Sequence, residues 1–260
     1  MKKSVKFFFV SIALVLVAQG TFAKPNGVDR IKKAGTLTVG VKDDVPGLGV
    51  KNPTTKEYEG LEIDIARAIA KQILGNESKI NFVSVNAKNR SAFLNQDRVD
   101  LVIATFTVTD ERKQLYDFSD VYYTDSVGLM VKKSSGITSF KNLENKKIGV
   151  TQGSMTTATI KNAAVKEGVF LNVVTYPSNK TLKNALDHGE IDAFCIDTSI
   201  LRGFIDDSVM ILPEHFGEMM YAVAIKKDNA ALTKQVNDVI RNMIKTGELD
   251  RLLKKHNLKF

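Results

Sequence analysis

The sequence predicts an α/β protein of two lobes, each an open, mostly parallel sheet with flanking helices. A strand–helix–strand–helix–strand succession occupies the first half of the chain, and the same succession returns in the second half. Two extended stretches follow these successions, which favours a two-strand hinge between the lobes. The 260 residues, 43% of them apolar and 25% charged, are enough to build two small cores.

The first succession contains a clear amphipathic helix. Leu61, Ile65, Ile69 and Ile73 recur at four-residue spacing and therefore predict a helix that buries one face. The apolar run after Asp100 is typical of a strand buried on both faces. We expect strands over 36–41, 80–85 and 100–105, helices over 60–74 and 90–96, and then a short helix capped by Thr109.

The second succession has the same order and fixes the expected division of the chain. Its elements are strands over 146–151, 171–176 and 191–196, with helices over 154–167 and 179–187. The extended stretches 126–131 and 219–225 would cross between the lobes, and the helical stretch 230–258 would then complete lobe one. Lobe one is expected over 24–127 and 223–260, and lobe two over 128–222.

The first 23 residues are typical of a secretory signal peptide. Lys2, Lys3 and Lys6 precede an apolar run over 7–18, and small residues end the segment at Ala23. That run is shorter than the roughly 20 apolar residues that span a bilayer. No cysteine follows it, so we expect a periplasmic protein without a lipid anchor, beginning at Lys24.

Charge and cysteine content argue against two kinds of function. Without the three leader lysines, 34 basic residues face 29 acidic ones, and the two signs are interspersed, so nucleic-acid binding is not expected. Cys195 is the only cysteine, which excludes an intramolecular disulfide. Its apolar neighbours predict a buried, unreactive thiol.

Polar residues that follow the predicted strands are the candidates for a binding site, because ligands of open α/β sheets bind beyond the carboxyl ends of the strands. Thr105 and Thr107 end one strand, and Arg112 follows in the next helix. A guanidinium beside hydroxyls and free backbone N–H groups suits a carboxylate. A surface arginine beside Glu111 is an equally acceptable interpretation.

Three more charged residues occupy similar positions. Asp197 ends the last strand of the second half and could bind an ammonium group across the cleft, although capping of the next helix is the commoner role for such an aspartate. Lys42 and Arg90 follow strands of the first half and could hold a side-chain carboxylate. Each of them alone is more often a solvated surface charge.

Several motifs resemble those of one family of transport proteins. They are GLEID at 60–64, IATFTVTDER at 103–112, DFSDVYY at 117–123 and GELDRLLKKH at 247–256. Over essentially the whole mature chain, the sequence resembles the periplasmic solute-binding proteins of polar amino acid ABC transporters. GVK at 40–42, DVP at 44–46 and VNAKNRS at 85–91 are most similar to the aspartate/glutamate-binding branch.

The resemblance implies a type II periplasmic binding fold, a monomer, and delivery of a free amino acid to an inner-membrane ABC permease. The implied ligand-binding residues are Lys42, Arg90, Thr105, Thr107, Arg112, Thr156 and Asp197. The arginine and threonines would bind the α-carboxylate, with backbone near Thr156, and Asp197 would bind the α-ammonium. Lys42 and Arg90 would neutralise an acidic side chain.

The chain also departs from the family near the cleft. Asp44, Leu48 and Leu61 stand where aromatic residues often enclose the ligand, and Met155 stands in a turn that is commonly rich in threonine.

The charges of the implied site favour an acidic ligand. Lys42, Arg90 and Arg112 against Asp197 leave it at +2, which suits aspartate or glutamate and disfavours lysine or arginine. Glutamine or another neutral polar amino acid is the alternative.

An enzyme and a membrane-bound sensor domain are the two alternatives to a binding protein. A cyclohexadienyl-dehydratase-like enzyme on the same fold would need an acid or base in the cleft. His188, His215 and His256 do not follow predicted strands, and Glu62 is expected on a helix surface, so we expect no enzyme, no cofactor and no metal. A membrane-bound sensor domain is disfavoured because the chain ends at Phe260 without a membrane span.

Overall fold

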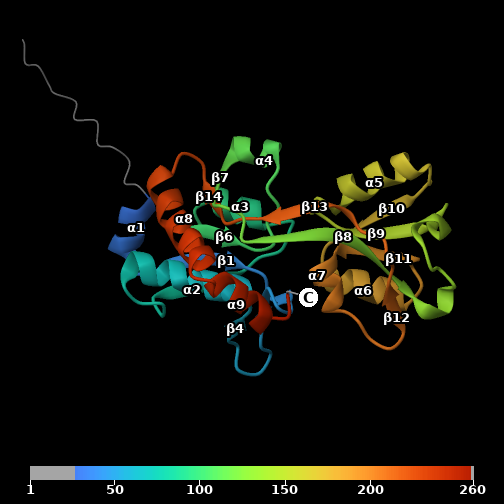
Figure 1. The fold of residues 1–260 in the computed structure, drawn as a ribbon, viewed down its shortest axis with the longest axis horizontal. Coiled ribbons are helices and arrows are strands. Elements are labelled where there is room, and N and C mark those ends of the chain that lie inside the picture. Colours follow the sequence, from blue (N-terminus) through green and yellow to red (C-terminus); the bar gives the residue numbers. More distant parts are fainter. Residues whose placement is uncertain (1–26, 259–260) are drawn as a thin grey trace, which may run out of the picture.

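The computed structural model describes residues 27–258, and the predicted signal peptide over 1–23 lies outside them. Two sheets with helices on both faces form two lobes side by side (Figure 1). The two-lobed α/β arrangement expected from the sequence is therefore present.

The sheet of lobe one has the strand order β5-β1-β6-β14-β7. Its strands are β1 (Leu37–Val41), β5 (Ile80–Ser84), β6 (Leu101–Ile103), β7 (Tyr116–Phe118) and β14 (Ala224–Lys226). Val41 is in register with Ser84 on one side and Ile103 on the other, so three parallel strands end at one edge. The helices of this lobe are α1 (Gly27–Ala34), α2 (Leu61–Leu74), α3 (Arg90–Asn95), α4 (Asp110–Leu115), α8 (Ala230–Lys245) and α9 (Glu248–Lys255).

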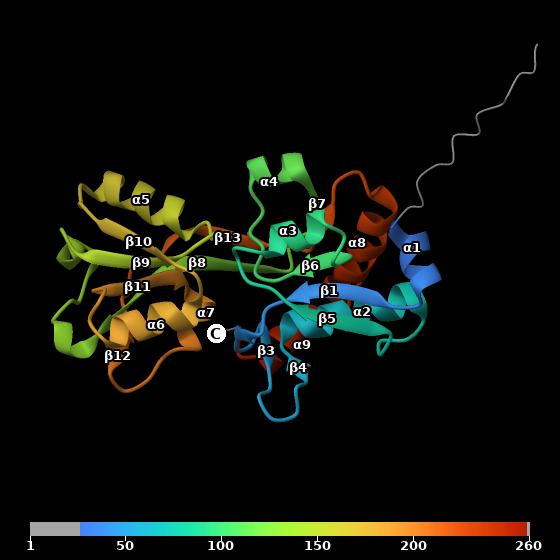
Figure 2. The same ribbon diagram turned by 180° about the vertical axis from the view of Figure 1, so that it is seen from behind.

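The sheet of lobe two repeats this plan with the order β10-β9-β11-β8-β12. Its strands are β8 (Tyr123–Lys132), β9 (Lys147–Thr151), β10 (Asn172–Tyr176), β11 (Ala193–Asp197) and β12 (Val209–Ile211). Helix α5 (Thr156–Glu167) covers one face, whereas α6 (Asn179–Asp187) and α7 (Thr198–Arg202) cover the other (Figure 2). Short 3-10 helices, η1 (Lys133–Ser135) and η2 (Phe140–Leu143), precede β9.

Two antiparallel strands connect the lobes. β8 pairs with β13 (Phe216–Tyr221), and Tyr123 lies opposite Tyr221. The sequence placed these crossings at 126–131 and 219–225; the second is in fact divided between β13 and β14. Because β8, β12 and β14 run antiparallel to their neighbours, each sheet is mixed, with a parallel core of three strands.

A small sheet that the sequence did not predict follows β1. It consists of β2 (Asp44–Val45), β3 (Gly49–Lys51) and β4 (Tyr58–Glu59). The carbonyl oxygens of Gly47 and Leu48 accept hydrogen bonds from the first N–H groups of α2, Leu61 and Glu62. Gly60 has φ +131°, and a Cβ there would lie 2.2 Å from the oxygen of Leu48, so only glycine permits this close contact.

The helical stretch expected over 230–258 consists of two helices, α8 and α9. Gly247, with φ +76°, separates α8 from α9. Lys255 and His256 then contact Asp64 at 2.8 Å each and fix this end of the chain on α2. Within residues 27–258, no helix is long and apolar enough to cross a bilayer.

Candidate functional site

A narrow cavity lies between the lobes, at the carboxyl ends of both sets of parallel strands. Five of the sequence-predicted residues line it: Lys42, Arg90, Thr105, Thr107 and Asp197. Lobe two adds Thr151, Ser154, Met155 and Asn179. The predicted residues Arg112 and Thr156 are not part of this lining, but each lies next to a residue that is. Arg112 donates to the carbonyl oxygen of Thr107, and Thr156 is close enough to Asp197 to lower its pKa.

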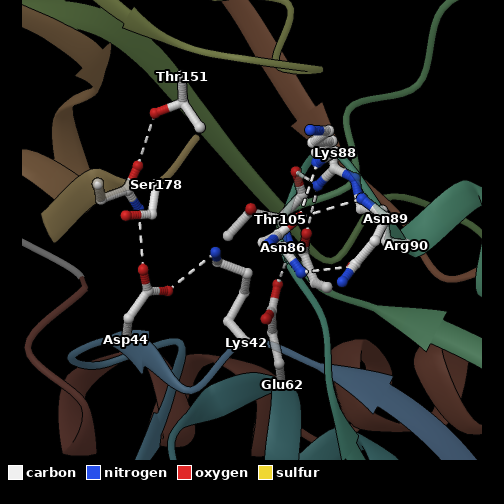
Figure 3. Close-up of polar contacts among 12 residues, drawn as sticks. Lys42, Asp44, Glu62, Asn86, Lys88, Asn89, Arg90, Thr105, Thr151 and Ser178 are labelled. Atoms are coloured by element: carbon white, nitrogen blue, oxygen red, sulfur yellow. Dashed lines mark hydrogen bonds and ion pairs between the residues drawn. The ribbon is translucent and has the colours of Figure 1, made fainter. Parts of the chain in front are cut away.

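A chain of polar contacts crosses the cavity from Lys42 to lobe two. The Lys42 ammonium lies 2.8 Å from a carboxylate oxygen of Asp44, and Lys42 is only 4% exposed (Figure 3). The other Asp44 oxygen accepts from the Asn179 amide at 3.5 Å, and Asn179 in turn accepts from the Thr151 hydroxyl at 2.8 Å. Lys42 therefore has a counter-charge within the protein.

Arg90 is held by a turn built from asparagine side chains. The Asn86 carboxamide oxygen accepts from the backbone N–H groups of Lys88 and Asn89 at 3.0 Å, and Asn89 accepts from the N–H of Asn86 at 2.8 Å (Figure 3). Arg90 begins α3 directly after this turn and donates to the carbonyl oxygens of Ala104 and Thr105. It is 2% exposed, and burial lowers its pKa.

Phe106 contacts both arginines. The guanidinium carbons of Arg90 and Arg112 are 4.3 Å and 4.7 Å from its ring centroid. Both distances are within the range of a cation–π contact, which stabilises each cation while limiting its movement. Phe106 is fully buried and packs against Phe118. This aromatic residue thus sets the spacing between the cations.

Arg112 is at the edge of the cavity and contacts both lobes. It donates to the carbonyl oxygen of Thr107 at 2.7 Å and to that of Gly153, in lobe two, at 3.4 Å. Burial, and then the nearby charge of Arg90, lower the pKa of Arg112 to about 10, so it remains a cation at neutral pH. Thr109 caps α4 through the N–H of Arg112, as the sequence predicted. Arg112 therefore does not extend into bulk solvent on an outer flank.

Glu62 is completely buried, so the expectation that it lies on a helix surface is wrong. Its Oε1 accepts the backbone N–H of Thr105 at 2.6 Å and the Tyr122 hydroxyl at 2.7 Å. Burial raises the pKa of Glu62, while these hydrogen bonds and the charges of Lys42 and Arg90 act in the opposite direction. The small sheet and the Tyr122 ring cover a position that helical periodicity alone assigns to solvent.

Asp197 faces the cavity from lobe two. It precedes α7, but its side chain makes no capping hydrogen bond, so the capping role that the sequence favoured is absent. Instead it accepts from the Tyr221 hydroxyl of the crossing strand. Burial, followed by the negative charge of Asp125, raises the pKa of Asp197 to about 7, against the effects of Tyr221, Arg90 and Thr156. The Thr156 hydroxyl lowers this pKa by its proximity, although its geometry falls short of a regular hydrogen bond.

The lobes are in close contact around the cavity. A Cβ at Gly153, which has φ +81°, would lie 2.5 Å from the carbonyl oxygen of Ala87 in lobe one. A Cβ at Gly203 would lie 2.7 Å from Pro46. The structure is therefore a closed form, in which glycines permit the lobes to meet.

Among the described residues that line the cavity, the titratable side chains are those of Lys42, Arg90 and Asp197. In residues 27–258, no three His, Cys, Asp or Glu side chains are placed to hold a metal ion. His188, His215 and His256 are not among the lining residues. Cys195 is buried, and burial raises its pKa well above the usual value, as its apolar neighbours suggested. The polar groups that face the cavity are suited to holding charges and hydrogen-bonding groups.

The sequence did not identify Asp44, Thr151, Asn179 or Glu62 as parts of the site. In the sequence, Asp44 is notable only because an aromatic residue is more usual at its position. Its position two residues after Lys42 is the signal that could have placed it near the site. Thr151 ends β9 and could have been found by the strand-end rule. Asn179 begins a helix, and nothing in its local sequence indicates the cleft.

Comparison with known proteins identifies the family. Residues 37–259 match the model of the bacterial extracellular solute-binding proteins, family 3. The chain belongs to this family. It is 37% identical over 236 residues to the ABC transporter glutamine-binding protein GlnH of Bacillus subtilis, covering 90% of this chain and 85% of that protein. It is 31% identical to the L-cystine-binding protein TcyJ of Escherichia coli, covering 95% and 92%.

Solved structures of amino acid-binding proteins share the fold. A cysteine-binding protein from Campylobacter jejuni superposes with a TM-score of 0.80 at 27% identity, covering 89% of this chain and 93% of that one. An ancestral arginine-binding protein bound to arginine gives 0.76 at 31% identity, covering 85% and 98%. The type II periplasmic binding fold expected from the sequence is thus confirmed.

Proposed function

We propose that this protein captures a polar amino acid outside the inner membrane and delivers it to an ABC permease, without catalysing a reaction. The observation that carries the proposal is the placement of cations and a carboxylate around one interlobe cavity. Arg112 with Thr105 and Thr107 binds the α-carboxylate from lobe one, and Asp197 binds the α-ammonium from lobe two. The ligand can contact lobe one through its carboxylate and lobe two through its ammonium group only when the lobes are closed. Ligand binding therefore favours the closed form.

The side chain of the proposed ligand is glutamine. The charge of +2 expected from the sequence omitted Asp44, which pairs with Lys42 and lowers the total to +1, and it omitted the buried Glu62, whose pKa is raised by burial. A carboxamide can accept from Lys42 or Arg90 and donate to Asp44. Glutamine-binding relatives from Bacillus subtilis and Geobacillus stearothermophilus, each 37% identical, support this choice over the acidic ligand.

Aspartate or glutamate is the second candidate. Arg90 is buried, and its Nε has no hydrogen-bond partner within residues 27–258, so a side-chain carboxylate would satisfy it. A glutamate-binding relative, GluB of Corynebacterium glutamicum, is 26% identical over 92% of this chain.

A thermal-shift screen of the 20 amino acids on refolded, ligand-free protein tests the proposal. Ligand at 100 times Kd adds about 2.7 kcal/mol of stability, which corresponds to roughly 5–10 °C for a protein of this size. Glutamine should give the largest shift, and calorimetry should then give its Kd. Larger shifts with glutamate or aspartate would transfer the assignment to the second candidate, and no shift with any amino acid would refute the function.

Export and assembly complete the proposal. The leader over 1–23 is removed to release a periplasmic monomer beginning at Lys24, with lobe one over 24–127 and 223–260 and lobe two over 128–222. Mass spectrometry of protein recovered from the periplasm gives the N-terminal residue directly. Light scattering gives the oligomeric state.

A further inference from the structure

Thr105 has a strained backbone in the wall of the cavity. Its φ is +48°, a left-handed conformation that β-branched residues rarely adopt. Such a conformation persists only where the surrounding structure holds it. Thr105 is 7% exposed and lines the cavity, so whatever holds its backbone also fixes its hydroxyl group.

Two buried side chains hold the peptide groups on either side of this residue. The Glu62 carboxylate accepts the Thr105 N–H at 2.6 Å, and Arg90 donates to the Thr105 carbonyl oxygen at 2.8 Å. Arg90 also donates to the carbonyl oxygen of Ala104. The segment is therefore fixed through its backbone, at one N–H and two carbonyl groups.

Glu62 has no direct place in the cavity. It does not line the cavity, it is completely buried, and its second oxygen, Oε2, has no hydrogen-bond partner within residues 27–258. A buried carboxylate with one unpaired oxygen is costly for folding, which points to a role other than stabilising the fold. Lys42 and Arg90 are close enough to lower its pKa, against the effect of burial.

We infer that Glu62 is a positioning residue for ligand binding: its carboxylate fixes the Thr105 N–H and thereby orients the threonine and arginine groups that meet the ligand. This inference rests on the proposed function, since it assumes that the cavity binds an amino acid. The role requires an acceptor oxygen at this point rather than a group that touches the ligand.

Three substitutions separate this role from a contribution to folding alone. Glu62→Ala leaves the Thr105 N–H buried without an acceptor and should raise the Kd for the ligand at least tenfold. Glu62→Gln keeps an acceptor oxygen in the same place and should restore the Kd to within fivefold of the unsubstituted protein. Tyr122→Phe removes the other donor to Oε1 but leaves the Thr105 bond, so its Kd should change less than threefold.

Amide hydrogen exchange provides a second measurement. The Thr105 N–H should exchange slowly in the unsubstituted protein and in Glu62→Gln, and quickly in Glu62→Ala, by a factor of at least ten. Normal affinity in Glu62→Ala, or equal weakening in Glu62→Gln and Glu62→Ala, would overturn the inference. Failure of the unsubstituted protein to bind any amino acid would instead refute the proposed function. If Glu62→Ala does not fold, the Kd values of Glu62→Gln and Tyr122→Phe still test the inference. A Kd raised more than tenfold in Glu62→Gln contradicts the acceptor role.

Discussion

Removing the charge of Asp44 should change which amino acid the cavity prefers. In the structure, Asp44 pairs with Lys42 at 2.8 Å and faces the Asn179 amide across the cleft. Asp44→Asn keeps the size of the side chain and removes its negative charge, so Lys42 loses its counter-charge. An acidic ligand side chain then supplies the missing anion, whereas glutamine does not.

The size of this change can be bounded by assuming that the ligand carboxylate lies about 4 Å from Asp44. Two unit charges about 4 Å apart interact by about 4 kcal/mol at an effective dielectric of 20. The repulsion between Asp44 and a ligand carboxylate is therefore at most about 4 kcal/mol, and solvent relaxation reduces it. The ratio of Kd for glutamate to Kd for glutamine should fall by roughly 10- to 1000-fold in Asp44→Asn.

Titration calorimetry with both amino acids on both proteins measures this ratio. The exposed Asp207, which does not line the cavity, offers a matched control, and Asp207→Asn should leave both values unchanged. A ratio that stays within threefold in Asp44→Asn would show that Asp44 does not determine the charge preference of the site.

Three further substitutions or conditions test the rest of the site. Arg112→Ala should weaken ligand binding by about 3–5 kcal/mol, because the α-carboxylate loses the half-buried cation that pairs with it, while Lys113→Ala next to it should have little effect. Near-normal calorimetric affinity in Arg112→Ala would refute the role. Gly153→Ala places a Cβ 2.5 Å from the Ala87 oxygen and should therefore prevent the lobes from closing. The decrease in radius of gyration that the ligand induces should then be lost in X-ray scattering, and an unchanged decrease would contradict the closure contact. The pKa of Asp197 is raised to about 7 in the closed form before an ammonium group is bound, so protonation competes with the ligand ammonium. Affinity should therefore fall by up to about tenfold per pH unit as the pH drops below 7. Above pH 7 the affinity should level off, and Asp197→Asn should remove this dependence; a flat profile in the unsubstituted protein would count against Asp197 as the ammonium ligand.

The strand-end rule selected several residues that line the interlobe cavity, because parallel strands share an edge. Val41 is in register with Ile103, and Val150 with Cys195, so residues following these strands converge although they are far apart in sequence. Lys42 and Asp197 were found in this way. No tertiary information was needed, since the periodicity of the apolar residues was enough to place the strands.

The same reasoning missed the groups that long-range packing brings in. Asp44 contacts two residues that line the cavity, Lys42 and Asn179, because a short hairpin folds back onto the first turn of α2. The two- and three-residue strands of this hairpin have no detectable periodicity. That hairpin also helps to bury Glu62, which local sequence assigns to a solvent-facing position. Both errors affected the predicted charge of the site, and thus the predicted ligand.

The proposed ammonium site is also continuous with the strands that join the lobes. Tyr221 donates to Asp197 and lies in β13, opposite Tyr123 of β8. Asp125, in β8, accepts from the Ser199 hydroxyl at 2.5 Å and from Tyr221 at 3.4 Å. An ammonium group that stabilises ionised Asp197 also strengthens the acceptor to which Tyr221 donates, and so couples ligand binding to the crossing strand β13. Binding and closure therefore share residues, and substitutions at Tyr221 should alter affinity without any contact to the ligand.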